Sequence, residues 1–162
     1  MTVMRLSTGK EIEIVTGKTL KLKNVLSKEI GSSESAEMQK AMHMFNSYMK
    51  SKKLTPYGPL IIYGKIAFEN GTLVQRNRMM IQIRENPDRT ESPYSFDELI
   101  RVENCIMARY RGDAASVQMA YGKINVHAFE NDIQLKGETY TVFVEQNDDG
   151  RILADVFAEI GS

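Results

Sequence analysis

Apolar residues recur with helical spacing in two stretches of the chain, one in each half. Intervals of four, three and four residues place the apolar side chains of the first stretch on one helix face: Met38, Met42, Phe45 and Met49. This pattern predicts a helix from about Glu34 to Lys53, with Ser33 as a candidate cap. A second helix is predicted at about Ala114–Asn131.

Alternating or β-branched apolar residues predict strands before and after each helix. In the first half these are Glu11–Val15, Leu20–Ile30, Leu60–Phe68 and Leu73–Arg84. In the second half they are Arg101–Tyr110, Thr139–Gln146 and Ile152–Ile160. Asn70-Gly71 is a hairpin signal, and Gly112–Asp113 is expected to form a turn. Residues 85–95 hold two prolines and many polar residues, which is typical of a linker.

The two halves coincide when the chain is shifted by 79 residues. The first helical set then falls on residues with the same spacing: Val117, Tyr121, Ile124 and Ala128. Gly58 falls on Gly137, and Leu60–Ile66 falls on Thr139–Glu145. We therefore expect an internal duplication within one α+β domain, with repeat one at about 10–84, a linker at 85–95 and repeat two at about 96–162. Two β-α-β-β repeats would form one antiparallel sheet with both helices on one face, related by a pseudo-twofold axis.

Composition argues against several classes of function. The chain has 21 basic and 21 acidic residues, so its net charge gives no attraction for nucleic acid or an anionic membrane. No apolar run approaches the roughly 20 residues of a membrane span. The first ten residues lack the apolar core of a signal peptide. With one cysteine, no disulfide forms within the chain. We therefore expect a cytoplasmic protein.

Residues that perform catalysis or bind metals are not grouped in the sequence. His43 and His127 have no second ligand at the usual spacing, so no metal site is expected. Cys105 lies among apolar strand residues, where a buried, unreactive thiol is the common case. No glycine-rich phosphate-binding loop is present. These observations favour a protein that is not an enzyme and carries no cofactor.

The second half contains the strand Cys105–Gly112, a helix with Tyr121, the segment Gly137–Phe143 and a closing strand to Ile160. In these features it resembles the GyrI-like family, which includes the effector-binding halves of multidrug-responsive regulators and free-standing gyrase-inhibitor proteins. In the first half, the resemblance rests on Tyr57-Gly58-Pro59 and Tyr63. It implies two β-α-β-β units, with an amphipathic, often cationic, aromatic small molecule bound in the seam between them.

Five residues are the candidates for the wall of this ligand-binding site: Tyr63, Tyr110, Thr141, Phe143 and Glu145. Their rings provide stacking faces and their hydroxyls provide hydrogen bonds, with Met79 or Met80 as flexible filler. Many members of the family have an acidic residue at the position of Thr141, which cannot supply that charge. Strand alternation predicts Thr141, Phe143 and Glu145 on one face, so Glu145 is a candidate substitute. For each of the five, packing in the core or on the sheet is the alternative.

Three functions follow from these expectations. The first is a free-standing module that binds an apolar or amphipathic aromatic small molecule. The second is a protein–protein interaction module that binds or neutralises a partner protein through an open sheet face or edge. The third is a small hydrolase of the same fold, which the missing acid at Thr141 disfavours.

Overall fold

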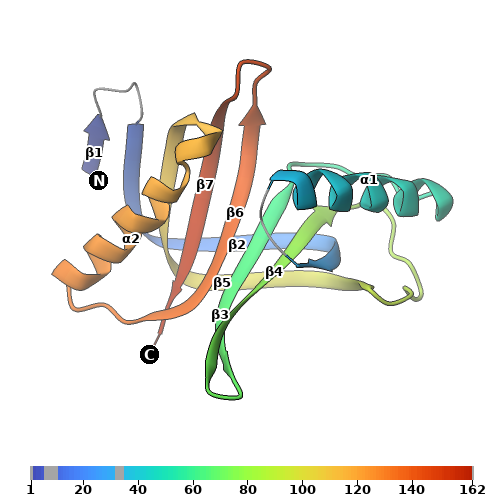
Figure 1. The fold of residues 1–162 in the computed structure, drawn as a ribbon, viewed down its shortest axis with the longest axis horizontal. Helices are drawn as coiled ribbons and strands as arrows, with labels where there is room; N and C mark the ends of the chain where they lie inside the picture. Colours follow the sequence, from blue (N-terminus) through green and yellow to red (C-terminus); the bar gives the residue numbers. More distant parts are fainter. Residues whose placement is uncertain (1, 6–10, 32–34, 162) are drawn as a thin grey trace. The chain divides into compact units, whose positions relative to one another are not determined.

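From residue 35 onward the chain folds into strands and helices in the order that the hydrophobic pattern predicts, whereas the first strand, at Thr2–Arg5, was not predicted (Figure 1). The computed structural model describes residues 2–5, 11–31 and 35–161. In chain order, its strands and helices are β1 (Thr2–Arg5), β2 (Glu11–Ile30), α1 (Ser35–Ser51), β3 (Ile61–Glu69), β4 (Thr72–Gln82), β5 (Tyr94–Asp113), a 3-10 turn (Ala114–Ser116), α2 (Gln118–Glu130), β6 (Leu135–Gln146) and β7 (Arg151–Ile160). The seven described strands form an antiparallel sheet. The predicted α+β class is therefore confirmed.

The chain forms two compact units, which share the two longest strands. Unit 1 comprises Met1–Leu20 and Val102–Ser162, and unit 2 comprises Lys21–Arg101. Strands β2 and β5 each begin in one unit and end in the other, because the boundaries fall inside them. The order β2-α1-β3-β4 is repeated by β5-α2-β6-β7, which is the predicted β-α-β-β pattern. The predicted linker lies within unit 2.

In unit 2, β4 lies between β2 and β3 and is antiparallel to both. Helix α1 packs on this layer with the face that its spacing predicts. Phe45 is fully buried, Met49 is buried, and Met38 and Met42 pack at the edge of the same cluster. Beneath them lie alternate residues of β2 and β4, with Ile83 directly after β4: Leu26, Ile30, Met79, Ile81 and Ile83. Burial of these side chains is the main stabilising term of the unit.

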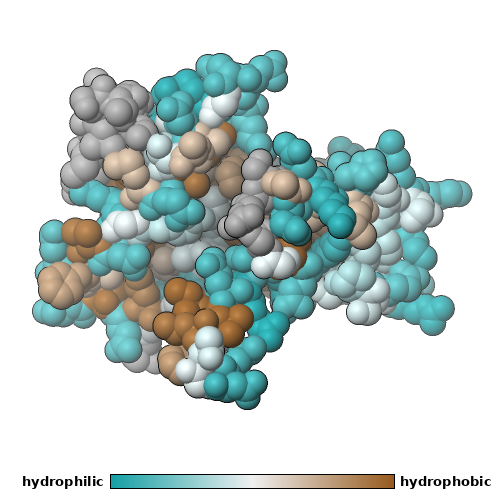
Figure 2. Space-filling model, in the orientation of Figure 1, coloured by the Kyte–Doolittle hydropathy of each residue, from teal (hydrophilic) through white to brown (hydrophobic). Residues whose placement is uncertain are grey.

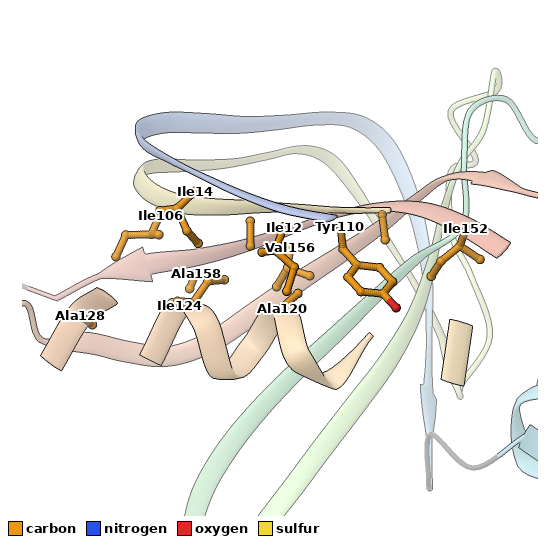
Figure 3. Packing of buried hydrophobic residues seen from close by; sticks show 12 residues of the cluster. Ile12, Ile14, Ile106, Tyr110, Ala120, Ile124, Ala128, Ile152, Val156 and Ala158 are labelled. Carbon is orange, nitrogen blue, oxygen red and sulfur yellow. The ribbon is translucent and has the colours of Figure 1, made fainter. Parts of the chain in front are cut away.

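In unit 1, β7 lies between β5 and β6, and β1 pairs with the start of β2. Helix α2 packs on this layer through small residues, Ala120 and Ala128, on either side of Ile124. Figure 3 shows these side chains against those of the strands, with Ile106, Tyr110 and Val156 among them. Because the alanine side chains are small, the larger side chains of the strands fill most of the core beneath the helix.

The predicted duplication is visible in the backbone of each unit taken separately. Lys53 and Asp132, which are 79 residues apart, have φ values of 57° and 54° just after the two helices. The amides that follow, Leu54 and Ile133, each donate a 2.8 Å hydrogen bond to a helix carbonyl five residues earlier. Gly58 and Gly137 have φ values of 82° and 88°, and Gly71 and Gly150 have 78° and 85°. Equivalent positive-φ positions are a local property that chance periodicity does not produce.

Some predicted boundaries are wrong, for identifiable reasons. Residues 11–30 form one strand, because Gly17 adopts its positive φ of 71° within β2 rather than ending it. Gly112 and Asp113 do not form a turn; they extend β5 and pair with Ile152 and Arg151 of β7. The predicted helix start at Glu34 and its cap at Ser33 lie outside the described residues.

Candidate functional site

A pair of hydroxyl groups lies between α2 and β6 in unit 1. Tyr121 of α2 and Thr141 of β6 share a short hydrogen bond between their side-chain oxygens. Thr141 is 1% exposed and Tyr121 is partly buried. Burial raises the pKa of the Tyr121 phenol, and the bond to Thr141 opposes this in part. The phenol is therefore a neutral hydrogen-bonding group near pH 7, and a poor base.

The pair retains one hydrogen that is not used between its members. Two hydroxyls carry two hydrogens, and their mutual bond uses one. The second hydrogen is available to an acceptor that reaches the pair. Within residues 2–5, 11–31 and 35–161, no carboxylate bonds to either hydroxyl, and no charged group contributes to the raised pKa of Tyr121. The arrangement can therefore donate a hydrogen bond to a neutral acceptor.

Phe143 lies on the same side of β6 as Thr141. The two residues pair with Ala154 and Val156 of β7, both of which face α2 in the buried cluster. Phe143 is partly buried and packs against this cluster. Because paired residues of neighbouring strands share a face, Thr141, Phe143 and Tyr121 are grouped on the helix side of unit 1. Of the predicted residues, Thr141 and Phe143 are thus brought together.

Glu145 lies on the other side of the sheet, so the predicted shared face is wrong. The register of β6 shifts between Phe143 and Glu145, and Glu145 pairs with Leu153 rather than with Ile152. Leu153 and Ala154 are neighbours on β7 and point to opposite faces. A bulge that inserts one residue reverses the faces that follow it. Glu145 is exposed there, on the face opposite to that of Thr141.

Tyr110 is a fully buried core residue of unit 1 (Figure 3). Its hydroxyl donates a 2.7 Å hydrogen bond to the backbone carbonyl of Asp113, and burial raises the pKa of the phenol. Both the ring and the hydroxyl have structural partners within the unit. Tyr110 therefore packs in the core, which is the alternative to a place in the wall of the ligand site.

Tyr63 belongs to unit 2, whereas the other four predicted residues belong to unit 1. It is partly buried on β3 and pairs with Arg78 of β4. The Arg78 guanidinium carbon lies 5.8 Å from the centre of the Tyr63 ring, within the range of a cation–π contact. Met79 and Met80, the predicted flexible filler, are 0% and 3% exposed.

The sequence did not indicate a partly buried ion pair on the opposite face of unit 1. Arg109 of β5 donates two 2.8 Å hydrogen bonds to the two carboxylate oxygens of Asp155 on β7. These residues are cross-strand partners, and Asp155 is 7% exposed. The two residues are 46 positions apart in the sequence and meet only through the register of β5 and β7. No local sequence pattern therefore predicts the ion pair.

Other kinds of site have little support in the described part of the chain. Cys105 is buried, and burial raises the pKa of its thiol, as expected for an unreactive cysteine. The described residues contain no group of three metal-ligating side chains. No described helix is both long and apolar enough to cross a membrane. A surface hollow of about 320 Å³ in unit 2, beside Glu29, Val74 and Arg76, is lined by none of the five predicted residues.

Solved structures with the same fold cover nearly the whole chain. The C-terminal domain of EcmrR matches with a TM-score of 0.70 and 12% identity, over 93% of this chain and 98% of that domain. EcmrR in a complex with DNA matches with a TM-score of 0.72 and 14% identity, and this chain spans 58% of the EcmrR chain. SAV2435 bound to tetraphenylphosphonium matches with a TM-score of 0.50 and 7% identity, over 93% of this chain and 94% of SAV2435.

A hydrolase from Listeria innocua also matches, with a TM-score of 0.50 and 11% identity, over 93% of this chain and 91% of the hydrolase. The sequence matches no protein-family model and no curated protein. At these identities the similarity establishes the fold. The chain has the fold of GyrI-like effector-binding domains.

Proposed function

We propose that this GyrI-like fold serves as a small-molecule-binding module rather than an enzyme, and that its ligand is an apolar or amphipathic aromatic compound. The observation that best supports this proposal is the group formed by Tyr121, Thr141 and Phe143 on the helix side of unit 1. It combines one aromatic face with a partly buried donor, as small-molecule sites do. Tetraphenylphosphonium on SAV2435, a protein of the same fold, supports an aromatic ligand.

The ligand preferred by this group is neutral. A cation bound beside Thr141 would meet two hydroxyls and no carboxylate among the described partners of the pair, and an unpaired buried charge is costly. A neutral ligand with an acceptor oxygen would instead take the unused hydroxyl hydrogen. The raised pKa of Tyr121 keeps that hydrogen in place at neutral pH. The same shift disfavours general-base chemistry by the phenol, in agreement with a binding role.

Two probes of similar shape separate these alternatives. Triphenylphosphine oxide is neutral and has an acceptor oxygen, whereas tetraphenylphosphonium is a cation without one. Calorimetry on the wild-type chain should show tighter binding of the oxide. Tyr121→Phe should weaken oxide binding by about tenfold, which corresponds to the loss of one hydrogen bond of about 1.4 kcal/mol. Met42→Leu, at the equivalent position of unit 2, is the matched control and should leave binding unchanged.

Three results would count against the proposal. Binding of each compound to Tyr121→Phe with the wild-type affinity would place the site elsewhere. Tighter binding of the phosphonium would show that a carboxylate takes part. Failure of a broad panel of neutral and cationic aromatic compounds to raise the melting temperature would remove the binding role itself.

An exposed apolar patch in unit 2 favours a second candidate, binding to a partner protein. Phe68 and Leu73 pair across the β3–β4 hairpin, and Ile66 lies on the same face two residues earlier. These side chains are 71%, 65% and 60% exposed. Figure 2 shows apolar side chains gathered where Figure 1 draws this hairpin. Grouped large apolar side chains on a surface are typical of interaction sites.

The patch can be tested separately from the small-molecule site. Phe68→Ser should abolish retention of a specific partner in a pull-down from cells of the source organism. Leu99→Ser is the control, because Leu99 is 52% exposed in the same unit but does not belong to the patch. Equal retention by both variants and the wild type would exclude the patch as the binding surface.

A further inference from the structure

Unit 2 contains a buried lysine on the helix-facing side of its sheet. Lys28 of β2 lies between Leu26 and Ile30, which both belong to the core under α1, and it pairs with Met79 of β4. Because alternate residues of a strand share a face, the side chain starts in the apolar layer. Lys28 is 8% exposed. Lysine is rarely buried to this extent unless it is paired.

The partners of the Lys28 ammonium are weak. It donates a 3.6 Å hydrogen bond to the thioether sulfur of Met44, and it lies 5.6 Å from the centre of the Tyr94 ring. Within residues 11–31 and 35–161, no carboxylate lies within ion-pairing distance of it. An ammonium has three donors and a full charge, and a thioether is a poor acceptor. The group therefore has unused hydrogen-bonding capacity in a partly buried position.

The fold does not require a lysine at this position. Asn24 and Asn104 have matching φ values of 51° and 57°, and aligning these two residues places Lys28 on Ala108. Ala108 is fully buried in the equivalent helix-facing layer of unit 1. One copy of the repeat thus packs its helix over a methyl group, whereas the other retains a charge. Burying the Lys28 ammonium costs desolvation free energy that unit 1 avoids with Ala108. We therefore infer that the lysine has a function in unit 2.

Tyr94, which lies beside the lysine, belongs to a cluster of three aromatic rings. The rings of Tyr48 and Tyr94 are stacked with centres 3.8 Å apart, and Phe45 meets Tyr94 edge-on at 5.7 Å. Tyr94 also donates a 3.3 Å hydrogen bond to the backbone carbonyl of Met44. The Met44 side chain, which covers the ammonium, is 46% exposed. A flexible thioether at the surface is readily displaced by a stronger acceptor.

We propose that Lys28, Tyr94 and Met44 form a second binding site, which takes the carboxylate of a small aromatic acid. The carboxylate replaces the Met44 sulfur as the acceptor of the Lys28 ammonium, and the aromatic ring of the ligand lies beside Tyr94 in the place of the displaced Met44 side chain. The charge-assisted hydrogen bond formed in this way is about twice as strong as a neutral one. The site lies wholly in unit 2 and is independent of the hydroxyl pair in unit 1.

Benzoate and its neutral isostere benzamide are suitable probes, followed by amide chemical-shift changes in NMR spectra. Benzoate should shift the amides of residues 28, 44 and 94, and benzamide should bind at least about tenfold more weakly. Lys28→Met keeps an unbranched stem without the charge and should weaken benzoate by a similar factor. Lys52→Met is the control, since Lys52 is an exposed lysine beside Tyr48, and this variant should bind benzoate as the wild type does.

Several outcomes would overturn this proposal. Equal affinities for benzoate and benzamide would do so, as would normal benzoate binding by Lys28→Met. Loss of binding in Lys52→Met alone would assign the anion to the surface lysine. Absence of shifts at these amides up to about 10 mM benzoate, a concentration that reveals even millimolar affinities, would also refute it. If Lys28→Met did not fold, the benzoate and benzamide titrations of the wild type would decide.

Discussion

Tyr121 and Thr141 in unit 1 occupy the positions that Met42 and Ile62 occupy in unit 2, 79 residues earlier. Unit 1 places a hydrogen-bonded hydroxyl pair between its helix and sheet, whereas Met42 and Ile62 are apolar side chains packed against the unit 2 core. At a second position unit 2 has the polar residue and unit 1 the apolar one, because Lys28 of unit 2 is equivalent to Ala108 of unit 1. Each unit therefore has a polar group where the other copy is apolar.

This contrast separates what the fold needs from what function adds. A position that is apolar in one copy shows that the backbone tolerates an apolar residue there. A buried polar group at the equivalent position in the other copy then costs desolvation without a structural requirement. The hydroxyl pair and Lys28 are the clearest cases, and both of our proposed sites are built on them.

Equivalent core residues of the two helices should show the largest effects. Phe45 and Ile124 are 79 residues apart and are 0% and 2% exposed. Phe45→Ala should lower the free energy of unfolding by about 3–5 kcal/mol, and Ile124→Ala by about 2–5 kcal/mol, through lost burial and the cavities left behind. Chemical denaturation measures both. A loss below about 1 kcal/mol at either site, outside the range for buried large residues, would contradict the equivalence of the two cores.

The helix faces were predictable because their spacing is local. Met38–Met49 and Val117–Ala128 repeat every three or four residues, and burial under the helix follows from that spacing. The glycines after each helix were predictable too, since Gly58 and Gly137 coincide in the shifted sequence. Gly17 misled the strand assignment, because a glycine at positive φ can lie within a strand as well as at its end.

The polar features of the candidate sites could be predicted only in part. Thr141 and Phe143 were selected correctly as neighbours on one face, but Tyr121 was not recognised as the partner of Thr141, since the two lie 20 residues apart on different elements. The bulge before Glu145 leaves no signal in the sequence and moves that residue to the other face. Lys28 is surrounded by alternating apolar residues, yet its burial depends on Met44 and Tyr94, which are distant in sequence.

Mutations in the hydroxyl pair test whether its two members stabilise unit 1 jointly. Tyr121→Phe leaves the buried Thr141 hydroxyl without its partner and should lower the free energy of unfolding by about 1–3 kcal/mol. The double variant Tyr121→Phe with Thr141→Val makes the site apolar, as in unit 2, and should recover most of this loss. Urea unfolding of the four proteins in the cycle gives the coupling energy. Additive losses in the double variant would show that the hydroxyls do not act as a pair.

Lys28→Met tests the reverse case. It gives unit 2 an apolar residue at the position of Ala108 and removes a buried charge that has no carboxylate partner among the described residues. We expect the free energy of unfolding to rise by about 1–3 kcal/mol, the range for a poorly compensated buried polar group. Thermal and urea unfolding against the wild type measure the change. A lower stability would show that the ammonium is well solvated or paired in solution.

The smallest expected effect is a pH-dependent change in stability that involves Glu91, which contacts Tyr48 in unit 2. Glu91 accepts 2.8 Å and 2.7 Å hydrogen bonds from Lys52 and Tyr48. These bonds, with that from Lys52 the larger influence, lower the pKa of its carboxyl from 4.5 to about 2. Because the folded pKa is depressed, the stabilisation is complete above about pH 4.5 and is lost as the pH falls toward 2.

Glu91→Gln should therefore unfold at a lower urea concentration than the wild type at pH 6, with a small difference. The difference should shrink as the pH falls from 4.5 toward 2. Lys65, an exposed lysine elsewhere in unit 2, offers a control: Lys65→Gln should not show this dependence. A difference that stays constant down to the lowest pH at which the chain is folded would contradict the assigned pKa.

The central claim is that the polar group of unit 1, and not its apolar counterpart in unit 2, binds a neutral aromatic ligand. The direct measurement is a titration of the isotope-labelled chain with triphenylphosphine oxide, followed by side-chain and amide NMR signals. The account predicts saturable shifts at Tyr121, Thr141 and Phe143, and much smaller ones at Met42 and Ile62. Equal shifts in both units, or shifts confined to unit 2, would contradict it.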